Sequence, residues 1–219
     1  RHHDGKVDRL SALAAELVRL KVDIIITVGA PAARAAKEAT VTIPIVMMQV
    51  GDAVGSGFVA SLARPGGNIT GLSTLAPELS GKRLELLKEI IPKLSRVGIL
   101  SMAGYTAFKD YEAAARGLKV PLQILEVPGP PPDLPAAFQA AVKARVSAII
   151  TTSTPGLAGH QKQIADLAVQ NRLPLMSESI AGVQAGGLAS YDADRAEIFK
   201  RAAVFIDKIL KGTKPADLP

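Results

Sequence analysis

Small polar residues and single carboxylates follow directly after short apolar runs at several places in this sequence. Asp52 comes after the run at 44–50, and Glu178 comes after the run at 173–176 between two serines. A carboxylate in such a place can accept hydrogen bonds from a hydroxyl or ammonium group, whereas hydroxyls and free backbone N–H groups can hold an anion. The candidate ligand-binding residues from five such places are Gly29, Ala30, Pro31, Gly51, Asp52, Ser101, Tyr105, Ser153, Thr154, Glu178 and Ser179.

Each of these places also has a purely structural explanation. The glycine at 29 suits a tight turn from strand to helix, and the residues at 52 and 153–156 are of types that cap helices or stabilise turns. The aromatic side chain at 105 and the carboxylate at 178 could equally lie in exposed loops. The sequence leaves both explanations open for every candidate.

Residue patterns of known catalytic and metal sites are missing from the sequence. There is no cysteine, so thiolate chemistry and Cys-ligated metals are excluded, and no G-x-S-x-G, P-loop or G-x-G-x-x-G motif occurs. The adjacent His2 and His3 have no third ligand at a suitable spacing. We therefore expect a binding protein that needs no metal and no cofactor. A small-metabolite enzyme using Asp52 and Glu178 as a carboxylate pair is the weakest alternative.

The elements that would position the candidate residues alternate between two kinds of segment. Short β-branched runs such as 23–28 are typical of strands buried on both faces, and the spacing of leucines in 7–20 is typical of an amphipathic helix. Such alternation predicts parallel sheets with helices on both faces, and ligands at the carboxyl ends of the strands. The predicted strands are 23–28, 44–50, 96–100, 121–126, 147–151, 173–176 and 186–191; the predicted helices are 7–20, 32–39, 77–90, 107–117, 135–144, 158–171 and 193–211.

One segment, 51–76, interrupts this alternation. It is rich in Gly, Ser and Thr and contains the turn signal Arg64-Pro65-Gly66-Gly67-Asn68. We expect the chain to pass between two lobes here.

The charge of the chain is positive but dispersed. The 219 residues carry a formal net charge of +6, with 48% hydrophobic residues and no Lys/Arg run that forms a stripe. We expect the basic residues, Lys82 and Arg83 among them, to lie on solvated helix faces and near helix ends. No stretch is long and apolar enough to span a bilayer, and no signal peptide is visible in these residues, although we expect that a segment before Arg1 could carry an export signal.

Four stretches, which cover most of the chain, resemble ABC-transporter substrate-binding proteins of the branch that includes the tryptophan- and tyrosine-binding proteins. Two of them contain specific motifs, SLARPGGNITGLS and ILKGTKPADLP, that are not general features of α/β folds. The stretches are DRLSALAAELVRLKVDIIITVGAPAARAAKEAT, TIPIVMMQVGDAVGSGFVASLARPGGNITGLS, LSGKRLELLKEIIPKLSRVGIL and AGGLASYDADRAEIFKRAAVFIDKILKGTKPADLP.

The resemblance implies a type I periplasmic-binding architecture of two Rossmann-like lobes joined by three crossovers. Lobe one would hold 1–75 with 193–219 returning to it, and lobe two would hold 76–192. It further implies a periplasmic or extracytoplasmic protein that captures a small polar solute, such as an aromatic amino acid or a related metabolite, by hinge closure. An ABC transporter permease would be its partner, with no nucleic acid, and with membrane association only through that permease or a lipid anchor.

The sequence departs from the family pattern in several places. Relatives begin with further elements before the position of Arg1 and continue beyond Pro219, so we expect the chain to be incomplete at both ends. The loop after Leu100 is shorter than usual, and Thr154 stands where relatives often carry Asp. The ligand-sensing core of a transcription regulator, which shares this fold, is the alternative function, although no helix-turn-helix module is visible.

Overall fold

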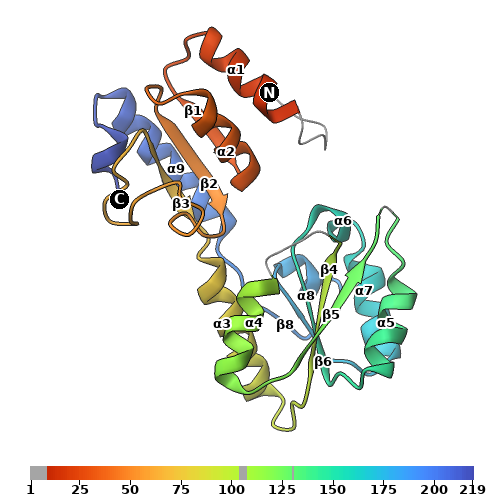
Figure 1. The fold of residues 1–219 in the computed structure, drawn as a ribbon. Helices are drawn as coiled ribbons and strands as arrows, with labels where there is room; N and C mark the ends of the chain where they lie inside the picture. The colour runs from red at the N-terminus through yellow and green to blue at the C-terminus, as the bar shows by residue number, and fades with distance from the viewer. Residues whose placement is uncertain (1–8, 104–107, 130) are drawn as a thin grey trace. The chain divides into compact units, whose positions relative to one another are not determined.

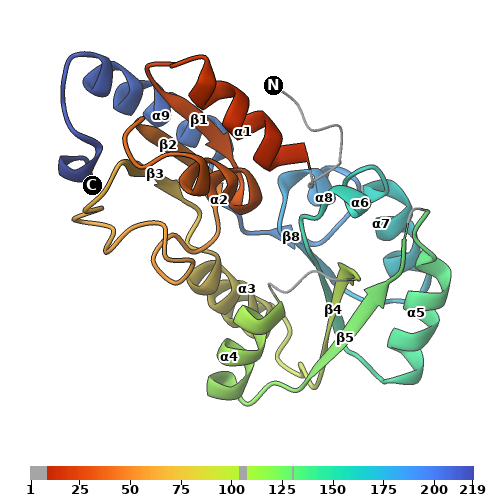
Figure 2. The same ribbon diagram turned by 45° about the horizontal axis from the view of Figure 1, so that its top comes forward.

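The computed structural model describes residues 9–103, 108–129 and 131–219. The chain forms two compact units, coloured along its length in Figures 1 and 2. Unit 1 holds the residues up to Ala76 together with Ala193–Pro219, and unit 2 holds Pro77–Asp192. The chain therefore leaves unit 1 after Ala76 and returns to it at Ala193.

Unit 1 is built on a three-stranded parallel sheet of order β1-β2-β3. Alternate residues of β2 face opposite ways: Ile45 and Met47 pack with the apolar cluster under α1 and α2, whereas Val46 and Met48 pack against α9. The elements are α1 (Leu10–Arg19), β1 (Ile25–Val28), α2 (Ala30–Ala39), β2 (Ile45–Val50), β3 (Ile69–Ser73), α9 (Arg195–Leu210) and a 3-10 turn at Pro215–Asp217.

Unit 2 is built on a five-stranded parallel sheet of order β5-β4-β6-β7-β8. Its strands are β4 (Val97–Met102), β5 (Leu122–Val127), β6 (Ala148–Thr151), β7 (Leu175–Ser177) and β8 (Ala189–Ser190). Its helices are α3 (Ala76–Ile90), α4 (Phe108–Leu118), α5 (Leu134–Lys143), α6 (Pro155–Ala158), α7 (Gln161–Gln170) and α8 (Ile180–Gln184).

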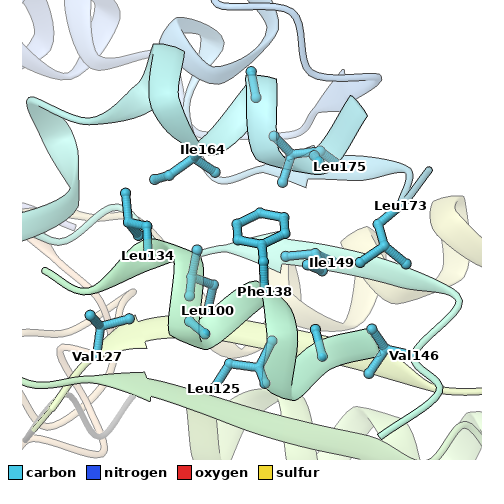
Figure 3. Close-up of a cluster of buried hydrophobic side chains, with 14 of the residues drawn as sticks. Leu100, Leu125, Val127, Leu134, Phe138, Val146, Ile149, Ile164, Leu173 and Leu175 are labelled. Carbon is cyan, nitrogen blue, oxygen red and sulfur yellow. The ribbon is translucent and has the colours of Figure 1, made fainter. Parts of the chain in front are cut away.

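Helices cover both faces of the unit 2 sheet. Ile99 and Ile150 pack against α3 and α4, whereas Leu100 and Ile149 pack against α5 and α7. Figure 3 shows the second cluster, in which the ring of Phe138 lies among aliphatic side chains from strands and helices. Because both faces are covered, the strands read as continuous apolar runs in the sequence, and only their ends carry polar residues.

The predicted fold class is confirmed, with two parallel-sheet α/β units flanked by helices. Three details differ from the predicted elements. The helix expected at 158–171 is interrupted at Gly159 and His160, which separate α6 from α7. The helix α8 and the strand β3 were not expected, since α8 is only five residues long and β3 lies inside the Gly-rich segment 51–76.

The strand β1 is not buried on both faces as its β-branched run suggested. Ile26 and Val28 are about half exposed, at 48% and 50%, whereas Ile25 and Thr27 are buried. The helix α9 packs on β2 and β3, and β1 lies at the edge of the described sheet. The strand β1 therefore has alternately buried and exposed side chains, although its sequence is almost entirely apolar.

Among the residues described, no helix combines the length and the hydrophobicity that a membrane crossing requires.

The strand β3 requires a glycine at position 71, and the neighbouring residues in the sequence do not indicate this requirement. Gly71 pairs with Met47 at a φ of +142°, and a Cβ built there would lie 2.0 Å from the Met47 carbonyl oxygen. We therefore expect Gly71→Ala to lower the free energy of unfolding by about 2–4 kcal/mol, through backbone strain and overpacking together. Urea unfolding followed by circular dichroism measures this loss.

Gly67→Ala is the matched control, because a Cβ at Gly67 would meet nothing within 4 Å. We expect it to change the free energy of unfolding by less than about 1 kcal/mol. Equal stability of the two variants would show that the close approach of β3 to β2 is not a constraint.

Candidate ligand-binding site

A buried carboxylate lies at the carboxyl end of the unit 2 sheet. Glu178, directly after β7, is only 8% exposed. Its Oε1 accepts hydrogen bonds from the Tyr111 hydroxyl at 2.6 Å and from Arg83 Nη1 at 3.3 Å, and its Oε2 accepts one from the Ser153 backbone N–H at 2.8 Å. Both oxygens are thus engaged by groups of the protein itself.

Arg83 and Tyr111 reach this carboxylate from helices α3 and α4. Arg83 also donates through Nε to the Tyr191 carbonyl at 2.6 Å and through Nη1 to the Tyr111 hydroxyl at 3.1 Å. One guanidinium therefore links α3 to α4, to the end of β7 and to the segment that follows β8. We use the name Glu178 network for Arg83, Tyr111, Glu178 and the Ser153 N–H.

The expectation that Arg83 lies on a solvated helix face is wrong, since it is 3% exposed. Sequence analysis also did not single out Tyr111. A signal for Arg83 was present: Ser80, Leu84 and Leu87 form the buried face of α3, and position 83 falls on that face at helical spacing. A cation on a buried face requires an acidic partner, which here comes from a distant strand end.

Burial raises the pKa of the Tyr111 hydroxyl well above its ordinary value, and the neighbouring Glu178 carboxylate adds to this shift. Arg83 opposes the shift but does not cancel it. The phenol therefore stays protonated and donates its hydrogen bond to Glu178 throughout the neutral range.

Two buried hydroxyls at the same edge of the sheet have no partner among the residues that the structure describes. They are Ser101 Oγ, which is fully buried at the end of β4, and Thr154 Oγ1, which is 4% exposed after β6. The strands β4 and β6 are neighbours, with Leu100 paired to Thr151 and the Thr152 N–H donating to the Leu100 carbonyl. A buried hydroxyl without a partner is costly, which is consistent with the predicted ligand-binding role of both residues; that role stays a prediction.

The other candidates in unit 2 have local roles. The Ser153 side chain is exposed, and its backbone N–H belongs to the Glu178 network. Ser179 caps α8, because its hydroxyl accepts from the Ala181 N–H. Tyr105 lies outside the described residues.

In unit 1 the candidates lie at two turns after strands. Gly29 precedes α2 with a φ of +81°, donates its N–H to the Met48 carbonyl, and is followed by Ala30 and Pro31 in the first turn of the helix. Asp52 is exposed and closes a turn by accepting from the Gly55 N–H at 2.7 Å, while the Gly51 carbonyl accepts from the Ala76 N–H. Their ligand-binding roles stay predictions.

A third buried hydroxyl without a partner in the described part of the chain lies in unit 1. It is Thr27 Oγ1, on the buried face of β1 two residues before Gly29. Sequence analysis missed it because a threonine inside a β-branched run is typical of any strand.

The described residues contain no group of three or more His, Cys, Asp or Glu that could hold a metal ion. The chemistry that this edge can perform is hydrogen bonding by hydroxyls and backbone amides to a polar solute. The Glu178 carboxylate already accepts three hydrogen bonds from the protein, and its predicted ligand-binding role stays a prediction.

Solved structures of similar fold agree with this arrangement. A conserved domain protein from Vibrio cholerae O1 biovar eltor is 28% identical with a TM-score of 0.84, over 100% of this chain and 74% of that chain. An ABC domain in complex with L-Trp from Streptococcus pneumoniae is 25% identical with a TM-score of 0.79, over 98% of this chain and 75% of that chain. The architecture is that of the type I periplasmic-binding proteins.

Sequence comparison gives the family. The profile described as ABC transporter substrate binding protein matches residues 2–219, and the chain belongs to this family. A tyrosine-binding protein of Clostridioides difficile (strain R20291) is 25% identical over 221 residues. That match covers 95% of this chain and 60% of the relative, so the chain spans about three fifths of the relative's length.

The raised pKa of Tyr111 predicts a dependence of stability on alkaline pH. Unfolded tyrosine ionises near pH 10. Above that pH the folded state retains a proton that the unfolded state loses, so the free energy of unfolding falls as pH rises, by up to about 1.4 kcal/mol per pH unit. We expect the native chain to show this fall between about pH 10 and the higher pKa of the folded state, with no contribution below pH 10.

Tyr111→Phe removes the titrating group, and we expect it to be less stable at neutral pH but to show a flatter decline above about pH 10. Tyr191→Phe, at an exposed tyrosine, is the matched control and should keep the native slope. Urea unfolding at a series of alkaline pH values measures the slopes. Parallel curves for native chain and Tyr111→Phe would contradict a buried, protonated Tyr111.

Proposed function

We propose that this chain is the solute-binding part of an extracytoplasmic substrate-binding protein of an ABC importer. The solute is a small polar molecule, with an aromatic amino acid or a related metabolite as the leading candidate. The protein captures this solute and transfers it to a membrane permease without chemical change, so it is not an enzyme. Capture by hinge closure of the two lobes stays a prediction.

The observation that carries the proposal is the pair of buried hydroxyls of Ser101 and Thr154, which have no hydrogen-bond partner among the residues that the structure describes. Ligands of parallel α/β sheets bind at the carboxyl ends of the strands, which is where both residues lie. Hydroxyls donate and accept, so each can bind a carboxylate, an amine or a hydroxyl of the solute. The Glu178 network supports this role, because it fixes the backbone at Ser153, one residue before Thr154.

Several other observations support the ligand class and the partner. The family comprises ABC transporter substrate-binding proteins, which favours transport over the regulator alternative. Two relatives are a tyrosine-binding protein and a protein in complex with L-Trp. We propose Gly29, Ala30, Pro31, Gly51 and Asp52 of unit 1 as further contacts, with the N-terminus of α2 suited to a carboxylate.

The proposal predicts binding of tryptophan, tyrosine or phenylalanine, measured by isothermal titration calorimetry. We expect Ser101→Ala and Thr154→Val each to weaken binding of the preferred solute by roughly threefold to tenfold, which is the usual effect of losing one hydrogen bond. Because these hydroxyls have no partner within 9–103, 108–129 and 131–219, we also expect neither substitution to lower the free energy of unfolding of the solute-free chain.

Two control variants sharpen this test. Thr154→Ser keeps the hydroxyl and should bind nearly as well as the native chain. Ser95→Ala, at an exposed serine before β4, should leave affinity unchanged. Failure of all three amino acids to bind would overturn the proposed ligand class. Full affinity in both hydroxyl variants, with a solute that does bind, would overturn the proposed site.

A further inference from the structure

Basic residues gather at the edge of the unit 2 sheet opposite the candidate ligand-binding site. The loops that enter β4, β5, β6 and β7, together with the last turns of α4 and α5, carry lysine or arginine. We use the name basic edge for the exposed members Lys93, Arg116, Lys119, Lys143, Arg145 and Arg172.

The sheet register brings these four loops to one edge. The Val97 N–H donates to the Pro121 carbonyl, the Ser147 N–H to the Arg96 carbonyl, and the Ile149 N–H to the Pro174 carbonyl. Neighbouring strands lie about 4.8 Å apart, so four loops span roughly 15 Å of the sheet. Side-chain contacts also connect the loops, since Arg96 Nη1 donates to the Ala144 carbonyl and Lys88 Nζ to the Leu118 carbonyl.

Three of these cations stand where the backbone favours glycine. Lys119, Arg145 and Arg172 follow α4, α5 and α7 with φ values of 55°, 56° and 55°. Helices commonly end in a left-handed residue, which is usually glycine, as Gly212 after α9 is here. A cation near a helix end is favourable through the helix dipole, but that attraction does not require the left-handed position. A cation therefore stands at three left-handed positions of this edge despite the backbone cost, as Lys21 does after α1 in unit 1.

The basic edge is not neutralised by the described part of the chain. None of its six side chains forms an ion pair there, whereas Lys162 pairs with Asp166 and Lys211 pairs with Asp207 on other surfaces. The helices that end at this edge carry the carboxylates Glu89 and Glu112 near it, fewer than the cations.

Exposed aliphatic residues occur near the ends of three of the helices that lead to the basic edge. Ile90, Val142 and Val169 are 47%, 49% and 70% exposed near the C-termini of α3, α5 and α7. Two of them share the last helical turn with a cation of the basic edge, since the backbone N–H of Arg145 donates to the Val142 carbonyl and that of Arg172 to the Val169 carbonyl.

We propose that the basic edge binds an anionic phospholipid surface. Cations distributed over four loops, rather than gathered in a groove, suit a broad layer of headgroups, and each exposed Lys or Arg strengthens such attraction. Aliphatic side chains beside them can enter the apolar boundary below the headgroups. The proposal does not depend on the identity of the solute.

Co-sedimentation with lipid vesicles tests this proposal on the full chain. We expect the chain to bind vesicles of equal parts phosphatidylglycerol and phosphatidylcholine roughly tenfold or more better than vesicles of pure phosphatidylcholine. Binding to the anionic vesicles should fall in high salt. The variant Lys93→Glu/Lys143→Glu/Arg172→Glu should lose roughly tenfold or more of that binding. Val142→Ser/Val169→Ser should weaken vesicle binding less than the charge variant does. This smaller loss should persist in high salt, because salt does not screen the burial of apolar side chains.

The charge-matched control is Lys200→Glu/Lys208→Glu/Lys214→Glu, at exposed cations on and after α9 in unit 1. It changes the net charge equally, and we expect it to retain most of the binding. Equal losses in the two triple variants, or no preference of the native chain for anionic vesicles, would overturn the proposal. Binding to polyglutamate without binding to vesicles would likewise overturn it and indicate an acidic protein partner. If the variant Lys93→Glu/Lys143→Glu/Arg172→Glu keeps the solute affinity of the native chain, its loss of vesicle binding is independent of the proposed solute-binding function.

Discussion

The architecture of unit 2 depends on a carboxylate that is removed from water. Glu178 follows β7 and would be unstable in its buried position without Arg83 from α3 and Tyr111 from α4. Removing one partner of a buried ion pair commonly costs about 3–5 kcal/mol, because the remaining charge stays desolvated. Both helices on one face of the sheet are thus fixed to the end of a central strand. The same network holds the Ser153 backbone and the Tyr191 carbonyl, so it positions two loops at the ligand-binding edge.

At that edge, the charged carboxylate and the buried neutral hydroxyls are therefore different groups. The carboxylate that looks most suited to a ligand is occupied by the protein, whereas the hydroxyls of Ser101 and Thr154 are buried and have no partner in the described structure. Under the proposed site, a solute would bind through neutral hydroxyls, and the buried ion pair would stay undisturbed as the solute enters or leaves. The opposite edge of the same sheet carries exposed cations and aliphatic groups, which suits it to a surface rather than to a small molecule. A parallel sheet makes this division possible because all its strands begin at one edge and end at the other.

Local patterns in the sequence predicted much of the fold, and long-range contacts explain most of what they missed. Buried strands such as β4 and β6 were predicted because parallel strands covered on both faces are continuously apolar. The strand β3 was missed because Gly71 is required by its close approach to Met47, which no local pattern shows. The places of Ser101, Thr154 and Glu178 at the ends of strands were predicted, whereas their ligand-binding roles stay predictions. The hydrogen-bond partners of Glu178 were not predicted, because Arg83 and Tyr111 lie 95 and 67 residues from Glu178 in the chain.

The most direct test of the account is a crystal structure of the chain with its preferred solute bound. The account predicts solute atoms within about 2.7–3.2 Å of Ser101 Oγ and Thr154 Oγ1, the ordinary hydrogen-bond range. It also predicts that Glu178 keeps its hydrogen bonds to Arg83, Tyr111 and the Ser153 N–H. A solute bound directly to Glu178 with Arg83 displaced, or one that leaves both hydroxyls without a partner, would contradict it.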